Sequence, residues 1–178
     1  GKIISDDRSL LKPKELDIYL PDLKLAFEVN GIYWHSSDAP KRDGRWVKWH
    51  QRDKTHACLA KGVRLVHYFE DEIQHNWEAL SQQVSLLLGT SSSRHYARDT
   101  LVVRPDWEIA KKFLDTHHLQ EAGPPAKAYG LVLDGELVSV MSFRSIEGGA
   151  QELARFASYG QVVGGASKLL KAALAGLK

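Results

Sequence analysis

The fold of this chain is decided by residues 15–35, Glu-Leu-Asp-Ile-Tyr-Leu-Pro-Asp-Leu-Lys-Leu-Ala-Phe-Glu-Val-Asn-Gly-Ile-Tyr-Trp-His. Two runs of alternating residues, Glu15–Leu20 and Leu25–Val29, flank a turn that begins with Pro21 and Asp22. This pattern predicts a β-hairpin. The side chains expected on its buried face are all apolar, namely those of Leu16, Ile18, Leu20, Leu25, Phe27 and Val29.

The opposite face of the hairpin carries Asp17, Tyr19, Ala26 and Glu28. A turn that closes symmetrically pairs Leu20 with Leu25, and it therefore places Asp17 opposite Glu28. Two carboxylates in that position repel each other. A hard cation with oxygen ligands would remove the penalty; the alternative is that both acids simply point into water.

The residues that follow carry a resemblance. An aspartate on the first strand, then Glu-x-Asn on the second, resembles the core motif of the PD-(D/E)XK nucleases, with Asn30 where that motif usually has lysine. The full run to Trp34 and His35 is more specific. It resembles the very-short-patch mismatch-repair endonucleases and the EDxHD-type homing endonucleases of phages. The likeness continues through His50-Gln-Arg-Asp-Lys-Thr55 to Phe69-Glu-Asp-Glu72.

The resemblance implies a metal-dependent endonuclease that hydrolyses phosphodiester bonds in double-stranded DNA. Mg²⁺, or Mn²⁺, would be held by Asp17, Glu28 and the carbonyl of Val29. His35 would act as general base, a task that suits its ordinary pKa near ~6.5, and Asp53 would also be functional. Asn30 can hold a water or a phosphate but cannot neutralise charge, so Lys54 or His50 would supply that charge.

Bulk composition narrows the class of protein. With 178 residues, 43% of them hydrophobic and 26% charged, the chain fits one medium domain or two small ones and is not disordered. Its single cysteine, Cys58, excludes a disulfide framework and the structural zinc of the repair enzymes. A reducing location is expected, the cytoplasm of a bacterial or phage-infected cell. No signal peptide or long apolar run indicates a membrane.

Positive charge gathers in the segment after the hairpin, although the formal net charge is only +2. Within residues 41–54 only Asp43 and Asp53 oppose it, which suits a DNA backbone. Trp34 either wedges between bases, as in the repair relatives, or packs in the core. The predicted DNA contacts in this region are Trp34, Lys41, Arg42, Arg45, Lys48 and Arg52.

Four further elements are predicted in the first half. Residues 1–14 suit an edge strand or packed arm, and a helix runs from about Arg45 to Lys61 with Gly62 as its stop. His50, Asp53 and Lys54 would share one side of that helix. Residues 63–69 predict a central third strand, reached by an α/β crossover. A final helix from Asp71 to Gly89 repeats apolar core residues at Ile73, Trp77, Leu80, Val84 and Leu87.

The second half changes character after a serine-rich segment, Thr90–Ser93. Just beyond it, Arg94 and Arg98 flank an aromatic residue, which suits contact with phosphates or a merely solvated basic linker. Strands are predicted at 100–104, 128–133, 136–143 and 151–157, with a helix at 107–117 and a tight Asp134-Gly135 turn.

Residues 161–166, Gln-Val-Val-Gly-Gly-Ala, resemble the pyrophosphate loop of the Gcn5-related acetyltransferases. Glycines allow backbone amides to approach phosphate at a helix start. The later strands of that fold are missing, so packing or DNA contact is preferred over cofactor binding.

The sequence therefore predicts an α/β protein: a PD-(D/E)XK (restriction-endonuclease-like) domain over 1–89, a linker over 90–98, and a small α+β, truncated acetyltransferase-like domain over 99–178. The oligomeric state is open, with a homodimer as one option. The alternative function is an acyltransferase-like enzyme that modifies DNA or protein and uses the first half for targeting.

Overall fold

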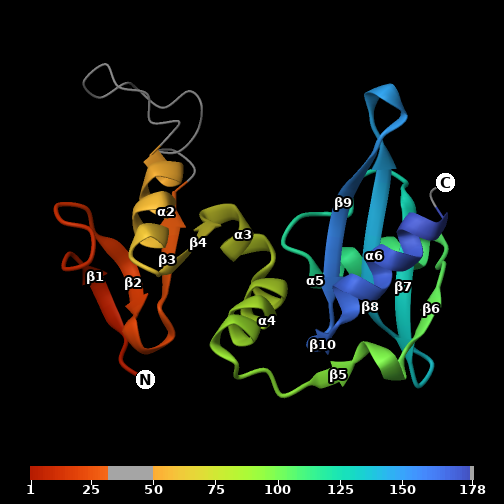
Figure 1. Ribbon diagram of the computed structural model, residues 1–178, viewed down its shortest axis with the longest axis horizontal. Helices are drawn as coiled ribbons and strands as arrows, with labels where there is room; N and C mark the ends of the chain where they lie inside the picture. Colours follow the sequence, from red (N-terminus) through yellow and green to blue (C-terminus); the bar gives the residue numbers. More distant parts are fainter. Residues whose placement is uncertain (32–49, 177–178) are drawn as a thin grey trace. The chain divides into compact units, whose positions relative to one another are not determined.

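The computed structural model describes residues 1–31 and 50–176, and it is of mixed α/β class (Figure 1). The chain divides into two compact units, Gly1–His75 and Asn76–Lys178. The linker predicted over 90–98 lies inside the second unit. None of the helices in the described part of the chain has the length and apolarity that a membrane crossing requires.

The first unit is built on a four-stranded sheet in the order β1-β2-β3-β4. Its strands are β1 (Ile4–Asp7), β2 (Leu16–Leu20), β3 (Leu25–Asn30) and β4 (Arg64–Phe69). The first three pair antiparallel, and β4 lies parallel to β3. Helix α2 (His50–Ala60) makes the crossover between β3 and β4, as predicted, and β1 is the predicted edge strand.

The hairpin register is the predicted one. Leu20 pairs with Leu25 and Ile18 with Phe27 across a short 3₁₀ turn at Pro21–Leu23. The prediction of one buried face was wrong at β3, where Val29 is 49% exposed while Ala26 is fully buried. Helix α2 covers the Ala26 face, because the crossover places Cys58 and its neighbours against it.

Two other predictions for this region were wrong. Among the described strands β4 lies at the edge of the sheet, and β2 and β3 are the inner strands. The single helix predicted after it is two helices, α3 (Glu70–His75) and α4 (Trp77–Leu88), separated by Asn76. Trp77 is 64% exposed and is no core residue. Gly89 ends α4 in the left-handed conformation, as predicted.

The second unit is built on an antiparallel sheet in the order β6-β7-β8-β9. The strands are β6 (Leu101–Val103), β7 (Lys127–Leu133), β8 (Glu136–Ser145) and β9 (Gln151–Ser158). Asp134 and Gly135 both have positive φ, at 51° and 87°, which is the tight turn expected between β7 and β8.

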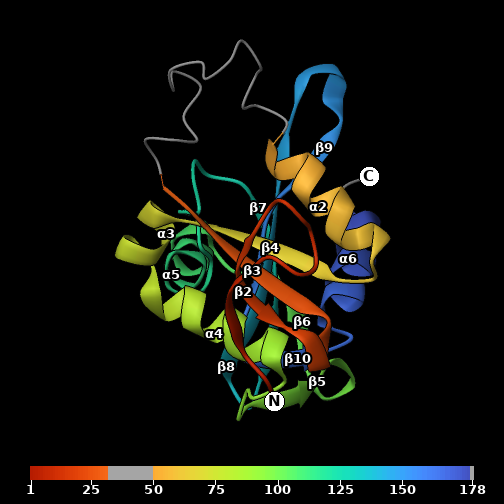
Figure 2. The ribbon, with the colours of Figure 1, turned by 90° about the vertical axis from the view of Figure 1, so that its left-hand side faces the viewer.

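Two helices cover this second sheet. Helix α5 (Trp107–His117) packs Phe113 and Leu114 onto one face with Val140, and α6 (Gly165–Gly176) packs Leu169 onto the other with Leu131. Figure 2 shows α5 and α6 on opposite sides of β7 and β8. Each sheet face therefore has its own apolar core.

A small parallel pair of strands completes this unit. Strand β5 (Arg94–Tyr96) pairs with β10 (Gln161–Val163), and a 3₁₀ turn, Ala97–Asp99, follows β5. Residues 94–96 of the predicted linker therefore belong to a sheet. The pairing partner is distant in sequence, so the local composition gave no sign of it.

Candidate functional site

The predicted carboxylate pair forms on the inner strands of the first sheet. The printed pairing of β2 with β3 ends at Ile18 and Phe27, and Asp17 and Glu28 are the next residues along the two strands. Glu28 Oε1 accepts a hydrogen bond from the amide of Asp17 at 3.2 Å, and Asp17 Oδ2 accepts one from the amide of Val29 at 2.7 Å. Each carboxylate is thus fixed by the main chain of the neighbouring strand.

Helix α2 brings Lys54 onto this pair. Lys54 and Cys58 lie one helical turn apart, an axial rise of about 6 Å, while Glu28 and Ala26 lie two residues apart on one face of β3, about 7 Å. The two spacings match, so Cys58 packs against Ala26 and Lys54 reaches Glu28. The Lys54 Nζ forms an ion pair with Glu28 Oε2.

This ion pair is buried, with Lys54 at 6% and Glu28 at 8% exposure. Charges are rarely buried unless they are paired, because an unpaired charge in the interior costs several kcal/mol, about 3–5 when one partner is removed. Burial also raises the pKa of the neighbouring Cys58 thiol, against the effect of Lys54. Cys58 is therefore a protonated packing residue and not a nucleophile.

Asn30 lies at the end of β3 in a polar network that the sequence did not reveal. Its side-chain nitrogen donates to the Tyr68 carbonyl at 3.2 Å and lies 3.3 Å from His67 Nδ1. The other ring nitrogen of His67 lies 2.9 Å from the hydroxyl of Thr55, which donates to the Gln51 carbonyl. This chain of contacts ties β3 and β4 to α2, next to Lys54.

His67 is a residue of this network that the sequence did not single out. A neutral ring that accepts at Nδ1 and donates at Nε2 satisfies both neighbours, because Asn30 can only donate through that nitrogen. The available signal was its place on β4: parallel pairing in register sets His67 beside Glu28.

Other predicted residues are not brought to this pair. Asp53 and Arg52 are exposed on α2 and lie 3.5 Å apart, Asp53 Oδ1 to the Arg52 guanidinium. The prediction that Asp53 and Lys54 present together is thus not met, since Lys54 is buried and Asp53 is not. His50 begins α2, and its side chain is outside the described part. Also outside it are Trp34, His35, Lys41, Arg42, Arg45 and Lys48.

The donor set suits a hard divalent cation. Mg²⁺ is commonly held by one or two carboxylates and keeps several waters, and Asp17 and Glu28 offer that number of carboxylates from adjacent strands. Within residues 1–31 and 50–176, no group of three histidine, cysteine or acidic side chains gathers. The further ligand predicted on this strand is the main-chain oxygen of Val29.

The glycine-rich segment of the second unit serves packing. Gly165 is buried, and a Cβ there would lie 3.0 Å from the Val162 side chain. Gly164 has a φ of 78°, a conformation that favours glycine. These constraints explain both glycines without a bound phosphate.

A scan against protein-family models gave no match, and searches of curated proteins and of solved structures found no similar protein.

Proposed function

We propose that this protein is a metal-dependent DNA endonuclease of the PD-(D/E)XK type, similar to very-short-patch-repair and EDxHD homing endonucleases. The observation that supports it is the contact of Asp17 and Glu28 across adjacent strands, with Lys54 of α2 paired to Glu28. The sheet and the β3–α2–β4 crossover carry these three groups on regular elements, where their positions are well fixed.

Phosphodiester hydrolysis needs a polarised phosphate, an activated water and a base. Mg²⁺ or Mn²⁺ bound at Asp17 and Glu28 would supply the first two by drawing charge from oxygen and by lowering the pKa of a bound water. The two acids keep the orientation that the main chain of β2 and β3 gives them.

Lys54 has two tasks in this proposal. Its ammonium balances Glu28 within a buried site, and its positive charge would favour the extra negative charge that develops on phosphate oxygens. Asn30, which occupies the place of the usual lysine, is held by Tyr68 and next to His67. It therefore contributes to the shape of the site and leaves the electrostatic task to Lys54.

His35 remains the proposed general base, on the family pattern alone, since it lies outside the described residues. The substrate is duplex DNA, and Arg52 on the exposed side of α2 is one proposed contact to it.

The test is plasmid cleavage by Asp17→Asn, in Mg²⁺ and in EDTA. Asparagine keeps an oxygen for the Val29 amide but removes the charge, so cleavage should fall to the level seen in EDTA. Asp134→Asn is the matched control, since Asp134 is exposed at a hairpin tip of the second unit. A variant at Asp17 that keeps most of its Mg²⁺-dependent activity would refute the metal assignment.

Metal binding can be measured without cleavage. Mn²⁺ should raise the melting temperature of the wild type and of Asp134→Asn, because a ligand stabilises the state that binds it. It should raise that of Asp17→Asn and Glu28→Gln much less. Equal shifts in all four proteins would place the cation elsewhere.

A further inference from the structure

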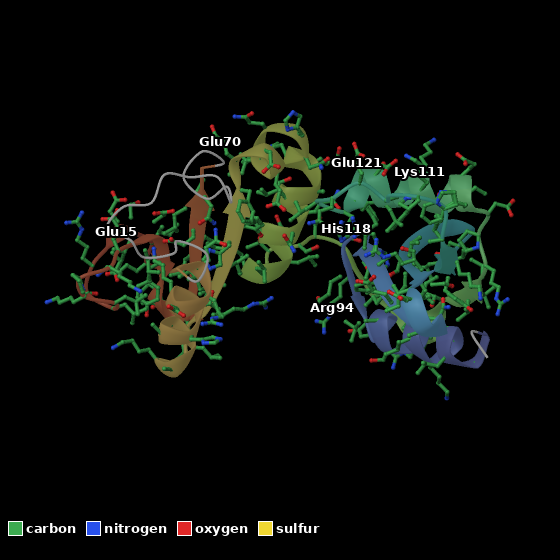
Figure 3. The ribbon with its side chains drawn as sticks, turned by 90° about the horizontal axis from the view of Figure 1, so that it is seen from above. Glu15, Glu70, Arg94, Lys111, His118 and Glu121 are labelled. Atoms are coloured by element: carbon green, nitrogen blue, oxygen red, sulfur yellow. The ribbon has the colours of Figure 1, made fainter. Side chains whose placement is uncertain are left out.

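An exposed cationic and aromatic surface lies on the small β5–β10 sheet of the second unit. Parallel pairing sets Arg94 beside Gln161 and Tyr96 beside Val163, and alternate residues of a strand share a face. All four residues are exposed, and Arg98 of the following turn is exposed with them. We call these five residues the β5–β10 face; Figure 3 labels Arg94.

Both arginines are arranged around one ring. The guanidinium carbon of Arg94 lies 5.5 Å from the centre of the Tyr96 ring, and that of Arg98 lies 4.9 Å from it. Stacking on an aromatic ring orients a guanidinium while leaving its charge and its N–H groups available.

The positive charge of this face is little neutralised. Arg98 lies 3.7 Å from the Asp99 carboxylate, but both side chains are exposed, at 78% and 56%, and such pairs contribute little. No acidic side chain of the described residues forms an ion pair with Arg94. The two guanidiniums can therefore bind an anionic partner.

Hydrogen bonds and a close backbone approach hold the segments of this face together. Lys168 of α6 donates to the carbonyls of Ala97 at 2.7 Å and Thr100 at 2.5 Å, which bracket the turn that carries Arg98. At the other end, a Cβ on Gly160 would lie 2.8 Å from the Ser93 carbonyl oxygen, so only glycine allows this approach. Two distant segments are thus packed together to form the β5–β10 face.

We propose that the β5–β10 face binds the phosphodiester backbone of DNA, with Arg94 and Arg98 on phosphates and Tyr96 holding both guanidiniums in place. This rests on the proposed function, because it names how the second unit contacts the same substrate. The contact is independent of base sequence, since phosphate contacts carry no sequence information directly. The glycine-rich segment then serves to build this face.

The test uses the full chain, a fluorescent duplex of arbitrary sequence, and EDTA to prevent cleavage. Anisotropy titrations at several salt concentrations give the affinity and the slope of log affinity against log salt. Arg94→Ala with Arg98→Ala should lower the magnitude of that slope by about two, roughly one for each lost phosphate contact. Lys112→Ala with Lys127→Ala removes the same charge from exposed positions elsewhere in this unit and should leave the slope nearly unchanged.

Variants of Tyr96 distinguish the orientation of the two arginines from their charge. Tyr96→Ala should weaken binding by roughly two- to fivefold, as expected for lost cation–π contacts at exposed sites, while the salt slope stays the same. Tyr96→Phe keeps the ring and should bind like the wild type. This pattern is expected only if the ring acts through the arginines.

The outcomes distinguish this inference from the proposed function. If the wild type binds DNA but the arginine variant keeps its affinity and slope, or if the lysine control loses as much slope, the β5–β10 face is not the contact. If the salt slope of the arginine variant decreases as expected but the wild type does not cleave DNA with Mg²⁺, the β5–β10 face is supported as a DNA contact and the nuclease proposal is refuted. A wild type that does not bind DNA overturns both.

Discussion

Lys54→Met removes the ammonium from the buried ion pair and keeps a side chain of similar length. The Glu28 carboxylate would then remain at 8% exposure with the Asp17 amide as its hydrogen-bond donor among the described residues. Removal of one partner of a buried pair costs about 3–5 kcal/mol, chiefly because the other charge stays buried. In the absence of metal, we therefore expect the free energy of unfolding of the first unit to fall by about 3–5 kcal/mol.

A double-mutant cycle measures the interaction energy between Lys54 and Glu28. Glu28→Gln keeps an oxygen for the Asp17 amide, and the double variant removes both charges, so it should be far less destabilised than the sum of the single variants. The coupling should be about 2–3 kcal/mol, the upper end for residues in contact. Lys61→Met, at an exposed position just after α2, is the control and should stay within about 0.5 kcal/mol of the wild type.

The assay is urea unfolding followed by circular dichroism in EDTA, with the two units fitted as separate transitions. Additive effects, or a loss below about 1 kcal/mol for Lys54→Met, would show that water reaches the pair and screens it. Repeating the titration in Mg²⁺ should restore part of the stability of Lys54→Met, because a bound cation replaces the lost charge and stabilises the folded state. No recovery would count against a metal at Glu28.

Three predictions concern other parts of the chain. His35→Ala should lower the cleavage rate by roughly 10²–10⁴-fold, the usual range for a lost general base, with DNA still bound; an unchanged rate in single-turnover assays would assign the proton to another group. Alanine at Arg42, Arg45 and Lys48 together should lower the magnitude of the salt slope of DNA binding by up to about three, and an unchanged slope would exclude phosphate contacts. Isothermal titration with acetyl-CoA should show no binding tighter than millimolar at residues 161–166, and a micromolar dissociation constant would revive the acyltransferase alternative.

The sequence by itself determined the local geometry around the site. Strict alternation and a Pro-Asp turn set the hairpin register, which pairs Leu20 with Leu25, and this register brings Asp17 next to Glu28. Gly62 and the Asp134-Gly135 turn ended a helix and closed a hairpin at the predicted places, because their backbone angles exclude most other residues. Such signals act over a few residues, so one sequence is sufficient to interpret them.

Only the tertiary structure decided which faces are buried and which distant groups meet. Alternation shows that Ala26 and Glu28 share a face, but it does not show that α2 covers that face and leaves Val29 exposed. In the same way, the contact of Asn30 with His67 and the pairing of β5 with β10 join segments far apart in the chain. Periodicity fixes the direction of a side chain within its own element, whereas its partner depends on how the elements pack.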